Sequence, residues 1–286
     1  MEAVTPRQIL EAPDLIAAGM AGDDVRRRMH GTRTTFVRVL EVHVDAPPTA
    51  LPPGCRAGEI RVVGSPRSLD AAVAAVRAAA ALAGDVPVTG FSVADLAALG
   101  PLAESVRTLS GAGLAAIAQL PIDAVADPEL AVQEIRQGGL SINAITVNQL
   151  DDDARLEICE RANRLQASGA GVRAFAPLAR TMSITKPTTG YDDVKMVALA
   201  RVVVTSVPSI QVDWQLYGPK LAQVALTVGA DDVDNISAVD PGVLGTRRSP
   251  LEEIRGNIKS AGLDPVERTG LFRVNSQTPT PDPQDN

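Results

Sequence analysis

His43 and Asp45 are the pair of side chains in this sequence whose types and spacing are suited to acid–base chemistry. They lie at the end of a predicted strand over residues 34–44 (TTFVRVLEVHV), and the other histidine, His30, precedes that strand. An imidazole held by a carboxylate can act as a general base near neutral pH. A partly exposed histidine at a loop end is the alternative interpretation, and the sequence leaves both open.

Further polar residues follow the other predicted strands. Carboxyl ends of parallel strands form one rim, so these residues are expected to meet there and bind a small polar ligand. Arg67 and Arg180 are the expected anion contacts, because guanidinium groups pair bidentately with carboxylate or phosphate; two solvated arginines are the alternative. The predicted ligand-binding set is Gly64, Ser65, Arg67, Ser92, Gln119, Asn148, Arg180, Gln215 and Asp234, with Asp123, Gln149, Tyr217 and Asn235 beside it.

The elements that must position these residues alternate along the chain. Eight strand–helix units predict a parallel sheet closed into an α/β, (β/α)8 TIM-type barrel. Asp231 and Asp232 are expected to bind the loop after the last strand. The predicted strands are 34–44, 59–63, 86–91, 114–118, 140–147, 172–176, 210–214 and 232–237, and the predicted helices are 69–83, 94–109, 128–137, 151–167, 191–206, 218–228 and 249–261.

The first crossover departs from this pattern. Residues 45–58 contain four prolines, which lack an N–H donor and resist a helix interior, so an irregular loop is expected in place of the first outer helix. The expected organisation is a leader of short helices over 1–33, the barrel over 34–274 and a disordered polar tail over 275–286. Asp14 and Asp23 are expected near helix starts, and Gly19, Gly22 and Gly31 at helix ends.

Composition narrows the function further. The 286 residues carry a net charge of −7, which disfavours nucleic-acid binding. Two cysteines, Cys55 and Cys159, and two histidines form no metal-ligand motif, so no metal site is predicted. No membrane span or signal peptide is evident, so a cytoplasmic protein is expected. Arginine outnumbers lysine and alanine is abundant, which favours a bacterial source with a GC-rich genome.

Several segments resemble a known family. They are FAPLA (175–179), MVALARVVV (196–204), VPSIQVDWQLYG (207–218), LAQVALTVGADDVDN (221–235) and IKSAGLDPVERTGLFRV (258–274), with EIRVVGSPRS (59–68) and VPVTGFSVADL (86–96) before them. In order and spacing these are similar to the radical SAM enzymes of the menaquinone pathway. Those are aminofutalosine synthase and cyclic dehypoxanthine futalosine synthase, with deazaflavin synthase subunits as relatives.

The resemblance implies a [4Fe–4S] cluster and S-adenosylmethionine, which the family holds with CxxxCxxC after the first strand. Here residues 44–58 contain Cys55 alone, so neither cofactor is expected. The expected function is that of a cluster-less homologue, with an accessory or ligand-binding role in or beside futalosine-route menaquinone synthesis. The alternative is a non-radical barrel enzyme that acts on a nucleoside-like substrate with His43 as acid or base. An intact radical enzyme whose cluster is supplied otherwise is disfavoured. A cluster-bearing homologue or a second copy is the expected protein partner.

Overall fold

Eight parallel strands close into a barrel in the computed structural model, which describes residues 5–11, 14–181, 188–240 and 249–274. Neighbouring strands pair in chain order from β2 to β8, and β1 closes the barrel between β8 and β2. This confirms the predicted fold. The strands are β1 (Arg33–His43), β2 (Glu59–Val63), β3 (Val88–Ser92), β4 (Ala116–Pro121), β5 (Ser141–Val147), β6 (Ala174–Ala179), β7 (Ser209–Asp213) and β8 (Asp232–Ser237).

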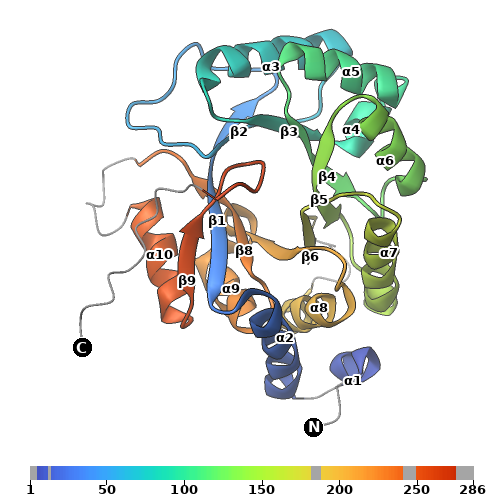
Figure 1. Ribbon diagram of the computed structural model, residues 1–286, viewed down its shortest axis with the longest axis vertical. Coiled ribbons are helices and arrows are strands. Elements are labelled where there is room, and N and C mark those ends of the chain that lie inside the picture. Colours follow the sequence, from blue (N-terminus) through green and yellow to red (C-terminus); the bar gives the residue numbers. More distant parts are fainter. Residues whose placement is uncertain (1–4, 12–13, 182–187, 241–248, 275–286) are drawn as a thin grey trace.

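The helices surround the strands in Figure 1. Parallel strands covered in this way are buried on both faces, which explains their apolar character. In β2, Ile60 and Val62 join the hydrophobic core, while Glu59 and Arg61 alternate with them. The helices are α1 (Pro6–Glu11), α2 (Leu15–His30), α3 (Leu69–Ala83), α4 (Val93–Ala97), α5 (Leu102–Ala112), α6 (Pro128–Gln137), the short η1 (Asp152–Ala154), α7 (Arg155–Ala167), α8 (Gly190–Val203), α9 (Trp214–Thr227) and α10 (Pro250–Ser260).

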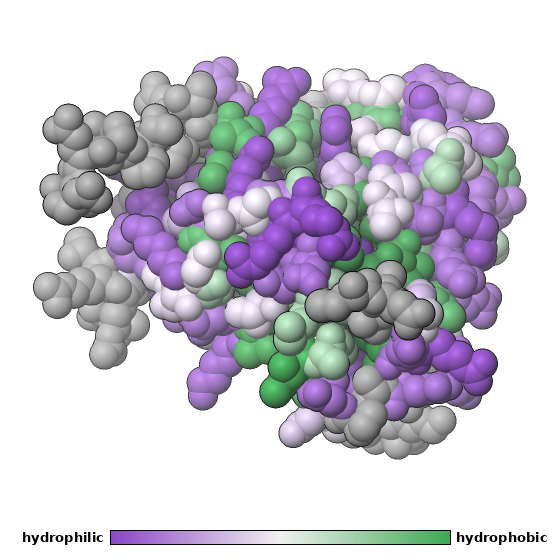
Figure 2. Space-filling view, turned by 60° about the horizontal axis from the view of Figure 1, so that its bottom comes forward, coloured by the Kyte–Doolittle hydropathy of each residue, from purple (hydrophilic) through white to green (hydrophobic). Residues whose placement is uncertain are grey.

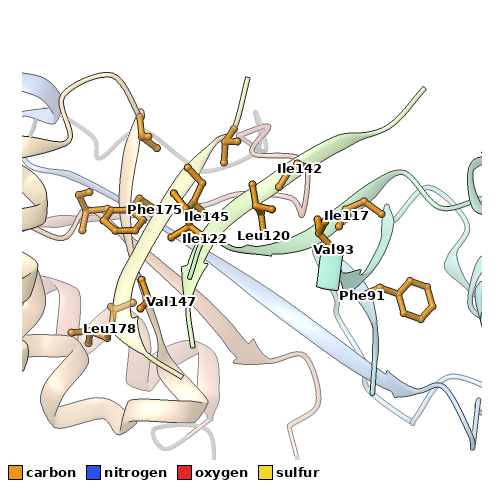
Figure 3. Packing of buried hydrophobic residues seen from close by; sticks show 14 of the residues in the cluster. Phe91, Val93, Ile117, Leu120, Ile122, Ile142, Ile145, Val147, Phe175 and Leu178 are labelled. Atoms are coloured by element: carbon orange, nitrogen blue, oxygen red, sulfur yellow. The ribbon is translucent and has the colours of Figure 1, made fainter. Parts of the chain in front are cut away.

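Branched aliphatic residues build most of the core. Figure 3 shows side chains from β3 to β6, among them Ile117, Leu120, Ile142, Ile145 and Phe175, packed in one cluster. Hydrophobic residues on the face shown in Figure 2 form small areas separated by hydrophilic ones. Among the described residues, no helix is long and apolar enough to cross a membrane.

The proline-rich crossover (residues 44–58) contains no helix, as predicted. Its end is fixed by backbone hydrogen bonds, because the Cys55 amide donates to the Pro52 carbonyl and the Arg56 amide donates to the Ala238 carbonyl beyond β8. The loop therefore returns along the outside of the barrel and enters β2 without covering β1 with a helix.

Several sequence predictions were wrong in detail. Asp23, expected near a helix start, lies in the middle of α2. The predicted helix over 94–109 is two helices, because Gly100, at a φ of 140°, and Pro101 interrupt it. Helix α2 continues through Gly19 and Gly22, which pack against Val228 at the end of α9 instead of ending a helix. Asp14 does cap α2, where its carboxylate accepts from the Ile16 amide, and Gly31 ends it.

A further difference is a ninth strand, β9 (Asp264–Glu267), which pairs in parallel with the first residues of β1. The segment after β9 then crosses the barrel interior (Figure 1): Gly270 donates to the Gly58 carbonyl, and its own carbonyl accepts from Asn143 of β5. The predicted disordered tail, 275–286, lies outside the described residues.

Candidate functional site

The interior of the barrel, called the lumen here, is charged. Arg61 of β2 forms a bidentate pair with Asp234 of β8, with N–O distances of 2.8 and 2.9 Å. Its Nε also donates to Glu59 at 2.7 Å, and Glu59 in turn accepts a hydrogen bond from Thr89 of β3. All four side chains are buried. Strands β2, β3 and β8 are therefore joined by ion pairs and hydrogen bonds inside the barrel.

A second arginine closes the lower lumen. Arg268 follows β9 and is 1% exposed; its guanidinium contacts both carboxylate oxygens of Asp232 at 2.6 Å. Gln211 of β7 donates to the same carboxylate at 2.8 Å, and the Arg268 guanidinium lies 3.8 Å from the centre of the Phe272 ring. The C-terminal segment therefore plugs the end of the barrel at which the strands begin.

The opposite end, called the mouth here, is where the strands finish. Arg180, next after β6, pairs with Asp213 at the end of β7 at 3.1 Å, and Asp213 also caps α9 through the Leu216 amide. Asn235 donates to Glu41 of β1 at 3.0 Å. Each mouth carboxylate described here therefore has a hydrogen-bonding partner already.

Some buried polar atoms between these groups have no partner within the described part of the chain. They are Glu59 Oε2, Thr146 Oγ1 and Asn235 Oδ1. Glu59 and Thr146, together with Gln119 and Arg180, line a cavity of about 10 Å³. That is room for one water-sized group. The upper lumen can therefore receive the polar end of a ligand, but only a small one.

A wider cleft opens beside this cavity at the ends of β5 and β6. Its volume is 290 Å³, and Arg180 lines both spaces. Tyr217 of α9 is fixed there, because its hydroxyl lies 2.9 Å from the carbonyls of Leu178 and Ala179. Burial raises the pKa of Asp193, a further lining residue. The cleft offers charged, hydroxyl and amide groups within a space large enough for a small metabolite.

His43 and Asp45 lie at the mouth, but they meet through the backbone. The Asp45 amide donates to His43 Nδ1 at 3.3 Å, whereas the Asp45 carboxylate lies 3.5 Å from Arg67 Nε. The imidazole rests against Gly64, where an added Cβ would lie 2.9 Å from His43 Nε2. An Nδ1 that accepts a hydrogen bond leaves the proton of a neutral imidazole on Nε2. His43 is therefore placed to donate a hydrogen bond at the mouth.

The other predicted residues do not form one cluster. Gln119, Arg180 and Asp234 share the lumen cavity, although Asp234 lies within β8 and not after it. Ser65 donates to Asp95, and Ser92 caps α4 through the Ala94 amide. The amides of Asn148 and Gln149 donate to Asp123. The side chain of Gln215 is exposed, and that of Arg67 is 82% exposed.

Asp231 and Asp232 have a structural role, but not after the last strand. Asp231 immediately precedes β8 and pairs with Arg201 of α8, and Asp232 begins β8 and pairs with Arg268. Residues of the lumen and the mouth that the sequence analysis missed are Glu41, Glu59, Arg61, Asn143, Asp213 and Arg268. Charges at alternating positions of a strand (Glu59 and Arg61 in EIRVV) could have indicated an inward polar face. Arg268 stands in the segment 258–274 that carries the family resemblance, but nothing in the sequence indicated that its side chain enters the lumen.

Comparison with known proteins adds ancestry to this geometry. Residues 174–280 match the family model described as the CofH/MqnC C-terminal region. The C-terminal part of this chain is therefore similar to that region of the CofH/MqnC proteins. The resemblance to radical SAM enzymes of the menaquinone and deazaflavin pathways is thereby confirmed.

Curated relatives agree with this family. An aminodeoxyfutalosine synthase of Thermus thermophilus is 33% identical over 136 residues, which cover 42% of this chain and 36% of that enzyme. A 5-amino-6-(D-ribitylamino)uracil–L-tyrosine 4-hydroxyphenyl transferase of Methanosarcina barkeri is 42% identical over 93 residues, covering 30% and 24% of the two chains. The chain thus spans well under half the length of these relatives.

The fold is shared more widely. The crystal structure of methylornithine synthase (PylB) superposes with a TM-score of 0.63 at 11% identity, covering 92% of this chain and 94% of that one. A likeness at such low identity supports the barrel fold only.

The cluster that the family implies does not fit the residues present. Cys55 is the one cysteine of the proline-rich crossover, and burial raises the pKa of its thiol. Cys159 is fully buried in α7, which follows β5 in the chain and not β1. One thiol after β1 cannot replace the three that the CxxxCxxC motif supplies. Within the described ranges, no group of three or more His, Cys, Asp or Glu side chains is placed to hold a metal ion.

Proposed function

We propose that this protein is a member of the CofH/MqnC family that works without a [4Fe–4S] cluster and binds a small polar ligand at the mouth of its barrel. The role is accessory or ligand-binding, that of a pseudoenzyme in or beside futalosine-route menaquinone synthesis. The observation that carries the proposal is the proline-rich crossover, which has one thiol where the family resemblance requires three. A role in bacterial menaquinone synthesis is supported by the similarity to the relative named aminodeoxyfutalosine synthase.

Ligand binding is supported by the groups that remain. The buried, unpartnered Thr146 Oγ1 and Glu59 Oε2 face the small lumen cavity, and Arg180 connects this cavity to the 290 Å³ cleft. Arg180 is 22% exposed and, among the described residues, pairs with Asp213 through one N–H group, so further guanidinium N–H groups can donate to a ligand. Arg67, by contrast, extends into solvent beside Asp45. We infer that Arg180 is the main anion contact of the mouth.

Anaerobic reconstitution with iron and sulfide tests the loss of the cluster. We expect no stoichiometric iron and no thiolate–iron absorbance after desalting, and no 5′-deoxyadenosine from added S-adenosylmethionine. A homologue with the CxxxCxxC motif, treated in parallel, is the positive control. Iron that survives desalting in the parent and disappears in Cys55→Ser would overturn this part of the proposal.

A thermal-shift screen of futalosine-pathway metabolites tests ligand binding. A ligand at one hundred times its dissociation constant adds about 2.7 kcal/mol to the free energy of unfolding. We expect Arg180→Gln to weaken a hit about tenfold or more, since a hydrogen bond to a charged group is worth about 1.5–3 kcal/mol. Arg67→Gln, an exposed arginine at the same rim, should bind as the parent does. Equal binding by both variants would remove Arg180 from the site.

The same hits test the alternative, a non-radical enzyme acting on a nucleoside-like substrate. His43 is the histidine of the mouth, and its contact with the Asp45 amide favours hydrogen-bond donation over proton abstraction. If His43 were a general acid or base, His43→Asn would slow turnover of a bound metabolite about 10²- to 10⁴-fold. A hit that is bound but not turned over by the parent supports the binding role; turnover lost in His43→Asn supports the enzyme.

A further inference from the structure

The end of the barrel opposite the mouth has a second cavity, called the floor pocket here. Its volume is 240 Å³. His30 from the end of α2, Arg33 from the start of β1, Arg173 from the loop before β6 and Ser209 from the start of β7 converge on it. Arg268 and Phe272, from the segment that plugs the barrel, separate it from the lumen. The Asp231 carboxylate, just before β8, also lines the pocket, which is therefore built from six parts of the chain.

Charge in the floor pocket is positive, although the whole chain has a net charge of −7. Arg268 and Arg201 are each paired with a carboxylate, those of Asp232 and Asp231. Arg33 and Arg173 also line the pocket and have no such carboxylate partner. Both are exposed, and their guanidinium groups have no hydrogen bond or ion pair within the described part of the chain. Two guanidinium groups thus remain available at one cavity.

His30 supplies a third potential donor. Its Nε2 is buried without a hydrogen-bond partner and lies 3.5 Å from Asp231 Oδ2. Asp231 Oδ1 accepts from the Ile210 amide at 2.8 Å and pairs with Arg201, whereas Oδ2 is the oxygen that faces His30 beyond ordinary hydrogen-bond distance. Burial lowers the pKa of His30. The positive charges of Arg201 and Arg26 lower it further, whereas the negative charge of Asp231 raises it. An anion in the pocket would favour the protonated imidazole.

We propose that the floor pocket is a binding site for a phosphate group, held between Arg33 and Arg173 with His30 as a third donor. Guanidinium groups are the usual partners of phosphate oxygens. Donors from three separate elements suit a tetrahedral anion better than a planar carboxylate. The site lies at the other end of the barrel from the mouth and does not depend on the proposed function.

Proton NMR of the two imidazole rings tests this proposal, because the chain has only two histidines and one lies at each end of the barrel. Inorganic phosphate is titrated into the untagged protein against chloride at constant ionic strength. We expect a saturable shift of the His30 resonances and a rise of about one unit in the His30 pKa. The His43 resonances should stay in place, whereas a ligand of the mouth would move them.

The double variant Arg33→Gln/Arg173→Gln should raise the dissociation constant for phosphate at least about tenfold, because it removes two charge-assisted contacts. The matched control is Arg77→Gln/Arg107→Gln, an equal change in charge at exposed arginines of α3 and α5, which should bind like the parent. An unsaturable His30 response, or one equal in the two double variants, would overturn the proposal.

Ribose 5-phosphate and succinate distinguish the sources of the anion. Tighter binding of the sugar phosphate than of inorganic phosphate would assign the site to phosphorylated metabolites, with Phe272 and Ser209 contacting the remainder. Equal binding would assign it to the phosphate group alone. Succinate should bind more weakly than either, and tighter binding of succinate would contradict the choice of phosphate.

Discussion

Asp234→Ala is expected to lower the free energy of unfolding by about 3–5 kcal/mol, because it leaves a buried guanidinium without its partner. Arg61 contacts Asp234 through two N–H groups inside the lumen, and the substitution leaves it with Glu59 alone. Water cannot compensate fully, since Arg61 is only 7% exposed. Denaturant unfolding of parent and variant, monitored by far-ultraviolet circular dichroism, measures the difference.

The matched control for this pair is Asp85→Ala, at an exposed turn, which should change stability by less than about 0.5 kcal/mol. Acid titration adds a second reading. Burial would raise the pKa of Asp234, but Arg61 lowers it from 3.8 to about 2. A depressed carboxyl pKa stabilises the fold above the unfolded value, and this contribution is lost as pH falls from about 4 to 2. Equal acid sensitivity of parent and Asp234→Ala would contradict the assignment.

Gly22→Ala is expected to destabilise the protein by about 3 kcal/mol, at the upper end of the usual cost of overpacking. A Cβ at this position would lie 2.1 Å from the Val228 carbonyl oxygen and 3.0 Å from Ala198 Cα of α8. Both obstacles are backbone atoms, so helix α2 must move away from the barrel. Thermal unfolding and limited proteolysis of the leader measure the loss.

Gly256 in α10 provides the opposite case, because a Cβ there meets nothing within 4 Å. Gly256→Ala should stabilise the protein by about 0.5–1 kcal/mol, since alanine loses less backbone freedom on helix formation. If the two variants have the same stability, α2 does not pack closely against the barrel through Gly22. That result would contradict the observed role of this glycine inside the leader.

The sequence by itself determined the barrel. Eight apolar strands alternate with amphipathic helices, and both periodicities are local properties that tertiary contacts reinforce here. Proline chemistry likewise determined the helix-free first crossover, because a missing N–H and a fixed φ act within the residue itself. The count of cysteines after β1 needed no structure either, since it depends only on which donor atoms the chain contains.

Contacts between distant segments were decided only by the tertiary structure. Gly19 and Gly22 are typical of helix ends in sequence, yet here they allow α2 to approach Val228, a residue about two hundred positions away. Strand β9 is four residues long and pairs with β1 from the far end of the chain. Such short segments carry too little periodicity to predict their pairing.

The candidate site divides in the same way. His43 and Arg180 stand at or just after strand ends in the sequence. Because parallel strands finish on one rim, this was enough to predict that both lie at the mouth. It could not show that Asp234 would be neutralised by Arg61, or that the Asp45 carboxylate would contact Arg67 and not His43. Partner choice among charged side chains depends on distances of a few ångströms across the lumen. Those distances are set by closure of the barrel and by the insertion of Arg268, which only the folded chain brings together with Asp232.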